Sequence, residues 1–271
     1  MTINSDSIFL SAKQKFVCED YALCGHDPVP FMILSDGCSS SENTDVGSRL
    51  LTHCVKKTLN TFVANSSLDI ETLGNVSISF AKSATDILNL PDTCLDATLI
   101  VAYINNKYLE INMYGDGTYV CEYKDGRKKL VTVSYKDNMP YYLNYIISLD
   151  RKKLYEEHTK DSSLSFKRID TISYEQCETK YEEYNSITHD SIEIDSIKSI
   201  SIFSDGISSF VDCIKNEKIQ LQKIIELFTS YKTTAGEFVK RRVRKAVEDL
   251  YKNHIYNTDD ISCCCMIFVE D

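Results

Sequence analysis

The chain has 271 residues, of which 43% are hydrophobic and 26% are charged. These fractions are ordinary for a globular protein and exclude collagen-like or wholly disordered chains, and the length suits one large domain or two small ones. Forty acidic against thirty basic residues give a net charge of −10. This excess argues against nucleic-acid binding, which depends on Lys and Arg at the phosphates.

The first third of the sequence predicts strands followed by two helices. Residues 6–23 carry apolar positions interrupted by polar ones, which suits one or two strands, and residues 29–35 form an apolar run that ends at Asp36. Apolar residues then recur at helical spacing over 45–64 and again over 69–90. We therefore expect strands and then two consecutive amphipathic helices.

The middle of the chain predicts an antiparallel meander. Four segments rich in Val, Ile, Thr and Tyr are separated by short turns that contain Asn or Gly, which favour hairpins. These segments are 97–104, 107–114, 118–123 and 129–134. Residues 136–195 are polar, rich in Tyr and poorly periodic, and they predict an insertion or flap over the domain surface.

The last part of the chain predicts a strand, two helices and a closing strand. The expected ranges are 199–204 for the strand, about 217–231 and 234–253 for the helices, and 261–269 for the last strand. The second helix contains the basic run KRRVRK at residues 240–245, with acidic neighbours. We interpret this run as a solvated helix face.

This order of elements is not the strand–helix alternation that parallel sheets require. It favours an α+β fold in which antiparallel sheets are covered by helix pairs. The sequence shows no internal repeat and no Pro/Gly linker, so we expect one domain over residues 1–271, with the flap at about 136–195. There is also no run of 18 apolar residues and no start typical of a secretory signal. We therefore expect a cytoplasmic protein that has no membrane partner.

The eleven cysteines form no C-x-x-C pair, so the short spacing typical of zinc sites and thioredoxin-like motifs is missing. We expect reduced thiols that act as small hydrophobic side chains. The five histidines likewise show no metal-ligand spacing.

Acidic residues stand repeatedly where predicted strands begin or end. They are Glu19-Asp20, Asp36-Gly37, Asp116, Asp205-Gly206 and Asp259-Asp260. A single Asp-Gly pair is ordinary turn chemistry, but several at strand ends would place carboxylates along one rim of a sheet. Because clustered carboxylates repel one another unless a cation neutralises them, the pattern also suits hard divalent cations, which prefer oxygen ligands. Spacing alone leaves both interpretations open.

These motifs resemble, in the same order, those of the metal-dependent type 2C serine/threonine protein phosphatases. The run VPFMILSDG at 29–37, followed by a Ser-rich loop and Gly47-Ser48, is similar to the aspartate-glycine motif of that family. Further similarities are FVCED at 16–20, Asp96-Ala97-Thr98 at a strand start, the Gly115-Asp116-Gly117 turn, IFSDG at 202–206 and TDDI at 258–261. The resemblance spans residues 16–269.

The resemblance implies a four-layer sandwich of two antiparallel β-sheets flanked by helix pairs (αββα), with two Mn²⁺ or Mg²⁺ ions in a cleft. The metal-site residues that it implies are Asp36, the Gly37 carbonyl, Asp205, Asp259, Glu19, Asp20 and Asp116. Asp36 would bridge both ions, and a water between the ions would attack phosphorus in line, without a covalent intermediate.

Four positions depart from the family's pattern. Lys15 stands where the family often has an Arg that holds the substrate phosphate, and it keeps the charge without the bidentate fork. Cys38 stands where some members have a His that could protonate the leaving group. Ser209 replaces an Asp, which leaves Asp116 short of a partner for a third metal. Asp260 replaces the usual Asn, and its charge either tightens metal binding or is merely exposed.

The sequence thus predicts a phosphatase that removes phosphate from Ser or Thr of a phosphorylated protein and opposes a kinase, with catalytic roles for Asp36 and Lys15. The alternative is a catalytically weak or inactive relative that binds partners as a regulatory module, which the departures at Lys15, Cys38 and Ser209 motivate. Retention of Asp36, Asp205 and Asp259 favours the enzyme, because an inactive relative has no need for three mutually repelling carboxylates. A small-molecule phosphatase is a third alternative.

Overall fold

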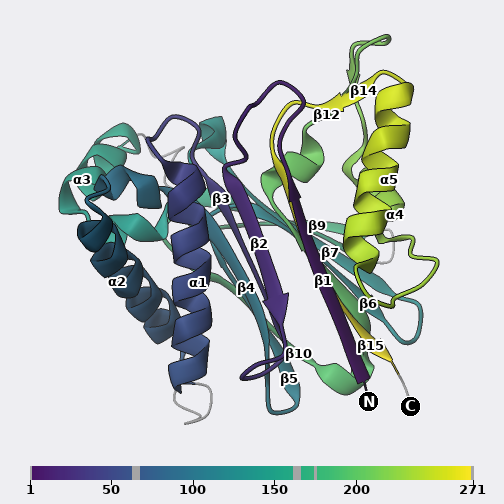
Figure 1. The fold of residues 1–271 in the computed structure, drawn as a ribbon, viewed down its shortest axis with the longest axis horizontal. Helices are drawn as coiled ribbons and strands as arrows, with labels where there is room; N and C mark the ends of the chain where they lie inside the picture. Colours follow the sequence, from purple (N-terminus) through teal and green to yellow (C-terminus); the bar gives the residue numbers. More distant parts are fainter. Residues whose placement is uncertain (1, 63–67, 161–165, 174–175, 270–271) are drawn as a thin grey trace.

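The structure is a computed structural model that describes residues 2–62, 68–160, 166–173 and 176–269. Residues 63–64 of the predicted helix 45–64, and residues 161–165 and 174–175 of the predicted flap, lie outside this description. Two antiparallel sheets lie face to face in the centre, with one helix pair on each outer side (Figure 1). The predicted α+β sandwich with four layers is therefore confirmed.

The larger sheet has seven strands in the order β1-β15-β11-β6-β7-β8-β9. Their bounds are β1 (Thr2–Leu10), β15 (Ile261–Val269), β11 (Ile197–Phe203), β6 (Gly117–Tyr123), β7 (Lys128–Tyr135), β8 (Phe166–Ser173) and β9 (Gln176–Glu183). The two ends of the chain meet in this sheet, because Thr2 pairs with Val269 (Figure 1).

The smaller main sheet has five strands in the order β10-β5-β4-β3-β2. They are β10 (Thr188–Glu193), β5 (Tyr108–Tyr114), β4 (Ala97–Asn105), β3 (Phe31–Gly37) and β2 (Asp20–Gly25). A third, short sheet consists of β13 (Glu217–Lys218), β12 (Phe210–Asp212) and β14 (Ile255–Asn257).

The core has three layers because both sheets are apolar on both faces. Met32 and Leu34 of β3 point between the sheets with Cys264 of β15, whereas Ile33 and its neighbours on the other face pack under helices. The alternation of side chains along a strand also explains the cysteine triplet. Cys264 faces the other sheet, and Cys263 and Cys265 face the helices on the outside. All eleven cysteines are free thiols, as expected.

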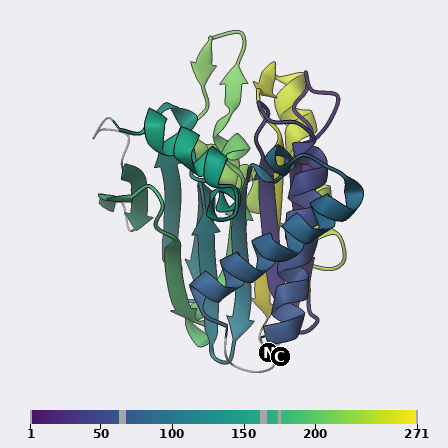
Figure 2. The same ribbon diagram turned by 90° about the vertical axis from the view of Figure 1, so that its left-hand side faces the viewer.

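Helices α1 (Thr44–Phe62) and α2 (Ile70–Leu88) cover the five-stranded sheet, and α4 (Leu221–Thr229) and α5 (Phe238–Lys252) cover the seven-stranded one (Figure 2). The α2 helix begins where the sequence predicts it, because Asp69 caps it by accepting a hydrogen bond of 2.7 Å from the Thr72 amide. It ends at Asn89, which adopts the left-handed conformation.

Two predictions need correction. The helix expected over about 217–231 begins only at Leu221, because Asn216 has a positive φ of 55° in the turn that joins β12 to β13. The segment 136–195 is not only a flap over the surface. It contains α3 (Leu149–His158), but its later part forms β8 and β9 at one edge of the large sheet and β10 at the edge of the small one.

Candidate functional site

A cavity of about 170 Å³ opens where strands of both main sheets end, and most of the residues that sequence analysis singled out surround it. Asp36 ends β3 of the small sheet. Asp116 lies in the turn where the chain crosses from β5 to β6, and therefore from one sheet to the other. Asp205 follows β11, and Asp259 precedes β15. The residues of the sequence prediction that line the cavity are Lys15, Asp36, Gly37, Asp116, Asp205 and Asp259.

Glu19 and Asp20 lie behind this lining rather than in it. Asp20 begins β2 and is the direct cross-strand partner of Asp36, so the fold fixes the two carboxyl groups side by side. The backbone around Asp36 is tight, because a Cβ atom on Gly37 would lie 2.7 Å from Cβ of Thr44 and 3.0 Å from the Glu19 carbonyl oxygen. Only glycine fits at this position without displacing its neighbours.

The carboxyl groups of Asp36 and Asp205 lie close enough to repel each other when both are ionised. Burial, together with the charges of Asp20 and Asp205, raises the pKa of Asp36 well above its usual range. Burial also raises the pKa of Asp116 well above its usual range, with help from Asp205 and Asp259. The cavity thus concentrates more negative charge than its surroundings can stabilise.

Asp20 is a deeply buried carboxyl group next to the cavity, with 1% of its surface exposed. Its Oδ2 atom accepts a hydrogen bond of 2.7 Å from the Ser204 hydroxyl, but its Oδ1 atom has no partner among the described residues. Burial raises the pKa of Asp20 to about 7, against the effect of the Ser204 hydrogen bond. An unpaired buried carboxylate oxygen is costly, and an ordered water or a cation would satisfy it.

Lys15 lies among the carboxylates instead of pointing to solvent. Its Nζ atom donates to Asp259 Oδ1 at 2.8 Å and to Glu19 Oε2 at 2.9 Å, and it lies 3.5 Å from Asp260 Oδ2. Although burial opposes protonation, the hydrogen bonds to Asp259 and Glu19 raise the pKa of Lys15 above its usual range. The ammonium group therefore neutralises one side of the acidic cavity.

We expect Lys15→Met to destabilise the protein in the presence of a chelator, because it leaves Glu19 and Asp259 without their cation. The site is partly open to solvent, so the loss should be about 1 kcal/mol, or about 2–4 °C in Tm for a chain of this size. Thermal unfolding measures it, with Lys57→Met on the exposed face of α1 as the control. Equal Tm values for the two variants would contradict the role of Lys15.

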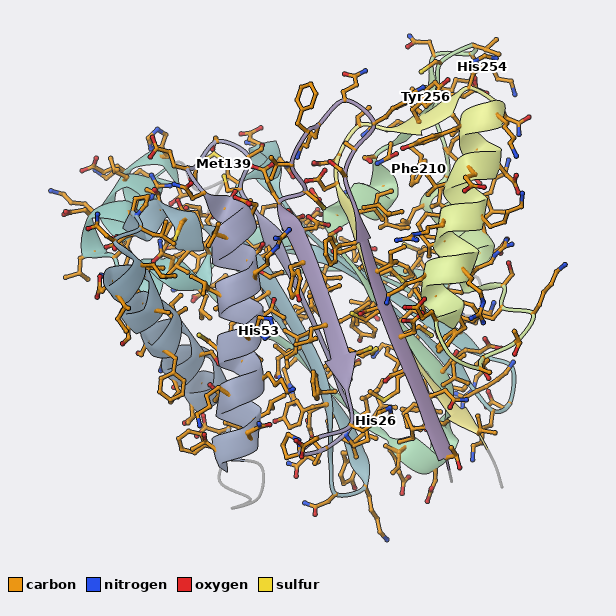
Figure 3. All side chains as sticks on the ribbon, viewed as in Figure 1. His26, His53, Met139, Phe210, His254 and Tyr256 are labelled. Atoms are coloured by element: carbon orange, nitrogen blue, oxygen red, sulfur yellow. The ribbon has the colours of Figure 1, made fainter. Side chains whose placement is uncertain are left out.

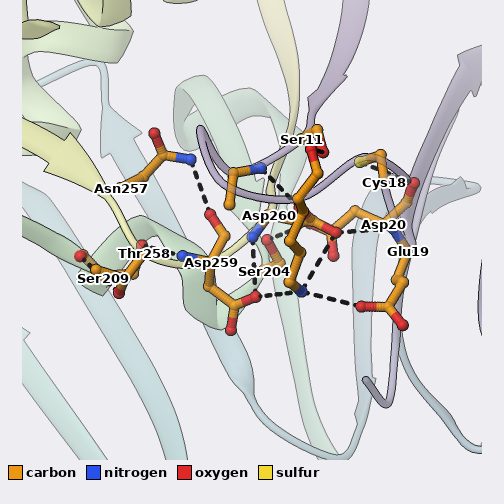
Figure 4. Close-up of polar contacts among 12 residues, drawn as sticks. Ser11, Cys18, Glu19, Asp20, Ser204, Ser209, Asn257, Thr258, Asp259 and Asp260 are labelled. Carbon is orange, nitrogen blue, oxygen red and sulfur yellow. Dashed lines mark hydrogen bonds and ion pairs between the residues drawn. The ribbon is translucent and has the colours of Figure 1, made fainter. Parts of the chain in front are cut away.

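Asp260 has a role that neither sequence interpretation foresaw, since it is neither exposed nor part of the cavity lining. It is 2% exposed, and it accepts backbone hydrogen bonds of 2.7 Å from Ala12 at Oδ1 and from Glu19 at Oδ2 (Figure 4). Asp260 thus fastens the β1–β2 loop, which carries Lys15 and Glu19, to the turn that carries Asp259. Two acceptor oxygens are needed for this, and an Asn side chain has only one.

We accordingly expect Asp260→Asn to lower the free energy of unfolding by about 1–3 kcal/mol, because one buried amide loses its acceptor. Urea denaturation measures the change. A variant as stable as the original chain would show that the loop does not depend on these two hydrogen bonds.

Ser209 binds the same turn from the other side. Its hydroxyl accepts a hydrogen bond of 3.2 Å from the Asp259 amide, and its carbonyl accepts one of 3.3 Å from the Thr258 amide. Ser209 therefore stabilises the turn that carries Asp259. The resemblance implied an Asp at this position, as a partner of Asp116 for a third metal.

The segment between β7 and α3, at the start of the predicted flap, also lines the cavity, with Asn138, Pro140 and Tyr142. Tyr142 contacts Cys38, which follows the Asp36-Gly37 pair. Burial opposes ionisation of the Cys38 thiol, but hydrogen bonds from Ser40 and Tyr142 outweigh this effect and lower the pKa of Cys38.

Asp96 connects α3 and the segment before it to the Ser-rich loop that follows Asp36-Gly37. Sequence analysis did not identify this role. Asp96 is fully buried, and it accepts hydrogen bonds from Ser41 at 2.8 Å, from Asn144 at 2.9 Å and from the Arg151 guanidinium of α3. Its carbonyl also accepts a hydrogen bond of 2.8 Å from the Cys38 amide. In the sequence, Asp96 stands out only as the first residue of the Asp96-Ala97-Thr98 similarity.

The donor set of the cavity suits a hard divalent cation, because it offers carboxylate oxygens in excess and one unpaired buried oxygen on Asp20. Within the described part of the chain, no group of three or more His, Cys, Asp or Glu side chains is arranged to hold a metal ion. The ion pair with Lys15, which engages Asp259, accounts for part of this arrangement.

The histidines lie away from this cavity. His53 is on α1, His26 is between β2 and β3, and His254 follows α5, at well-separated places in Figure 3. In the residues that the structure describes, no helix is both long and apolar enough to cross a membrane.

Comparison with known proteins agrees with this geometry. A sequence model of the family described as protein phosphatase 2C matches residues 11–250. This chain therefore belongs to the protein phosphatase 2C family. No curated protein sequence matches it.

Several solved structures share the fold. The Mycobacterium tuberculosis serine/threonine phosphatase PstP/Ppp has a TM-score of 0.54 at 12% identity, over 100% of both chains. Stp1 from Staphylococcus aureus has a TM-score of 0.57 at 10% identity, over 100% of this chain and 96% of that one. The catalytic domain of PstP in complex with 2 manganese ions has a TM-score of 0.54 at 13% identity, over 99% of both chains. At such identities these comparisons establish the fold.

Proposed function

We propose that this protein hydrolyses phosphoserine or phosphothreonine in a protein substrate, with two Mn²⁺ or Mg²⁺ ions as cofactors, and that it opposes a serine/threonine kinase. The observation that carries this proposal is the convergence of Asp36, Asp116, Asp205 and Asp259 on one cavity in a protein phosphatase 2C fold. Carboxylates brought together in this way are costly unless cations neutralise them. The related PstP domain, crystallised with two manganese ions, supports the same cofactors here.

In this proposal, Asp36, the Gly37 carbonyl, Asp205 and Asp259 hold the ions, with Glu19, Asp20 and Asp116 around them. Bound divalent ions would polarise the phosphoryl group and lower the pKa of a water molecule. Loading requires that Asp36, whose pKa is raised, is ionised and that Lys15 releases Asp259. Lys15 also lines the cavity, so its ammonium group is placed to bind a phosphoryl oxygen there.

The test is phosphate release from a phosphothreonine peptide and from an aryl phosphate, with and without Mn²⁺. The Asp205→Asn variant is compared with Asp195→Asn, which changes an exposed carboxylate outside the cavity. We expect manganese-dependent release that Asp205→Asn abolishes and Asp195→Asn leaves unchanged. A folded protein that binds Mn²⁺ but releases no phosphate from either substrate would contradict this proposal and favour the regulatory module.

A further inference from the structure

The basic run of α5 fits its interpretation as a solvated helix face only in part. Lys240 pairs with Glu237 at 2.6 Å, one turn before it, as expected of a solvated face. Arg241 and Arg242 instead line a second cavity, of about 480 Å³, between α5 and the connection from α4 to α5.

This second cavity is strongly cationic in a chain whose net charge is −10. Lys232, Arg241, Arg242 and Lys245 line it, against the single carboxylate of Asp249. That carboxylate is already engaged, because it lies 2.9 Å from Nζ of Lys245. The cavity therefore has an excess of about three positive charges, by count of its lining side chains.

Backbone carbonyl groups hold both guanidinium groups in position. Arg242 donates from Nε to the Leu227 carbonyl at 2.5 Å, near the end of α4, and Arg241 donates from Nη2 to the Ala235 carbonyl at 2.7 Å. Within the described part of the chain, neither guanidinium makes another hydrogen bond. Because a guanidinium carries five N–H donors, most of them remain to bind a ligand. Arg side chains fixed in this way lose little entropy when they bind an oxyanion.

We propose that this second cavity binds a phosphoryl group. A phosphate monoester carries a charge of about −1.5 to −2 at pH 7 and three acceptor oxygens, which suits two oriented guanidinium groups and two ammonium groups. Tyr231 and Phe238, whose rings pack edge to face with centroids 4.9 Å apart, form an apolar wall beside the cations. These rings would contact the organic part of the ligand, to which the phosphate is bonded.

The second cavity is separate from the carboxylate cavity. It runs along α5 from Phe238 to Asp249, and none of its lining residues lines the carboxylate cavity. The proposal is therefore independent of the proposed phosphatase activity and concerns a docking or effector site.

Calorimetry in the presence of a chelator tests the proposal on the full chain. The ligands are inorganic phosphate, a phosphothreonine peptide and the same peptide without phosphate. The double variant Arg241→Gln/Arg242→Gln, which removes two positive charges, is compared with Arg244→Gln, which removes one from the same helix outside the cavity. Lys232→Gln, on the exposed connection, serves as a second variant if the double variant does not fold.

We expect the original chain to bind the phosphate-bearing ligands, and the double variant to bind them at least about tenfold more weakly, since it loses charge-assisted hydrogen bonds. Arg244→Gln should bind within about twofold of the original chain, and the double variant should keep any aryl phosphate hydrolysis. Tighter binding of the phosphopeptide than of inorganic phosphate would identify a phosphorylated protein as the source, and equal binding would identify free phosphate. Absence of binding, equal losses in Arg244→Gln, or equally tight binding of the unphosphorylated peptide would overturn the proposal.

Discussion

Asp36→Asn is expected to abolish manganese-dependent phosphate release and, in the presence of a chelator, to make the protein more stable. If Asp36 holds the ions as we propose, its loss would remove several kcal/mol of transition-state stabilisation, which corresponds to a rate decrease of about a thousandfold. The gain in stability follows from the raised pKa of Asp36, because folding currently brings this carboxyl group next to Asp20, Asp205 and Asp116. An Asn side chain at this position carries no charge and offers N–H donors to the neighbouring carboxylates.

The pH dependence of this gain has a defined sign. The pKa of Asp36 is higher in the folded than in the unfolded chain, so Asp36 lowers stability wherever the unfolded chain has released its proton. The advantage of Asp36→Asn should therefore appear above about pH 4 and vanish below it. Urea denaturation at pH 3.5 and pH 7 (both about half a unit or more from the ordinary Asp pKa) measures it, with Asp195→Asn as the control. A destabilised Asp36→Asn protein at neutral pH would show that the cluster is not repulsive.

Gly206→Ala is expected to destabilise the protein strongly. A Cβ atom at this position would lie 1.7 Å from the Asp260 carbonyl oxygen, which is backbone and cannot rotate away. The short helix that starts at Asp205 would have to move from the turn that carries Asp259. Overpacking of this kind costs about 3 kcal/mol, and here it would also separate two of the proposed metal ligands.

Gly126→Ala is the matched control for this prediction. Gly126 has a positive φ of 86°, but nothing lies within 4 Å of a Cβ atom there. Its cost should therefore be only the conformational penalty of about 1 kcal/mol. Urea denaturation compares both variants with the original chain. If Gly206→Ala were no less stable than Gly126→Ala, the close approach of η7 (Asp205–Ser208) and the Asp259-Asp260 turn would not hold.

The sequence predicted the layers of the fold well, because periodicity is strong where one face of an element is buried. The helices over 45–64 and 69–90 and the meander from 97 to 134 carry such patterns. The strand β9 does not, since nearly all of its side chains are exposed and give no alternation of apolar and polar residues. For this reason the segment 136–195 was expected to be a flap rather than partly a continuation of both sheets.

The carboxylates of the site could be predicted because each stands next to a strand end, but their partners could not. The ion pair of Lys15 with Asp259 joins residues 244 positions apart, and the Ala12–Asp260 hydrogen bond joins residues 248 apart. No local pattern signals such contacts. The contact between Asp96 and Arg151 was missed for the same reason, since it depends on how α3 docks against the start of β4.

The central claim is that the carboxylate cavity holds two divalent ions that the reaction requires. The most direct measurement titrates Mn²⁺ into the original chain and into Asp36→Asn by calorimetry, and follows phosphate release from the phosphothreonine peptide at the same Mn²⁺ concentrations. We predict two bound ions per chain and phosphate release that rises with their occupancy. Asp36→Asn should lose both the ion binding and the phosphate release. Phosphate release that does not depend on Mn²⁺ or Mg²⁺, or Mn²⁺ binding that Asp36→Asn leaves unchanged, would contradict the claim.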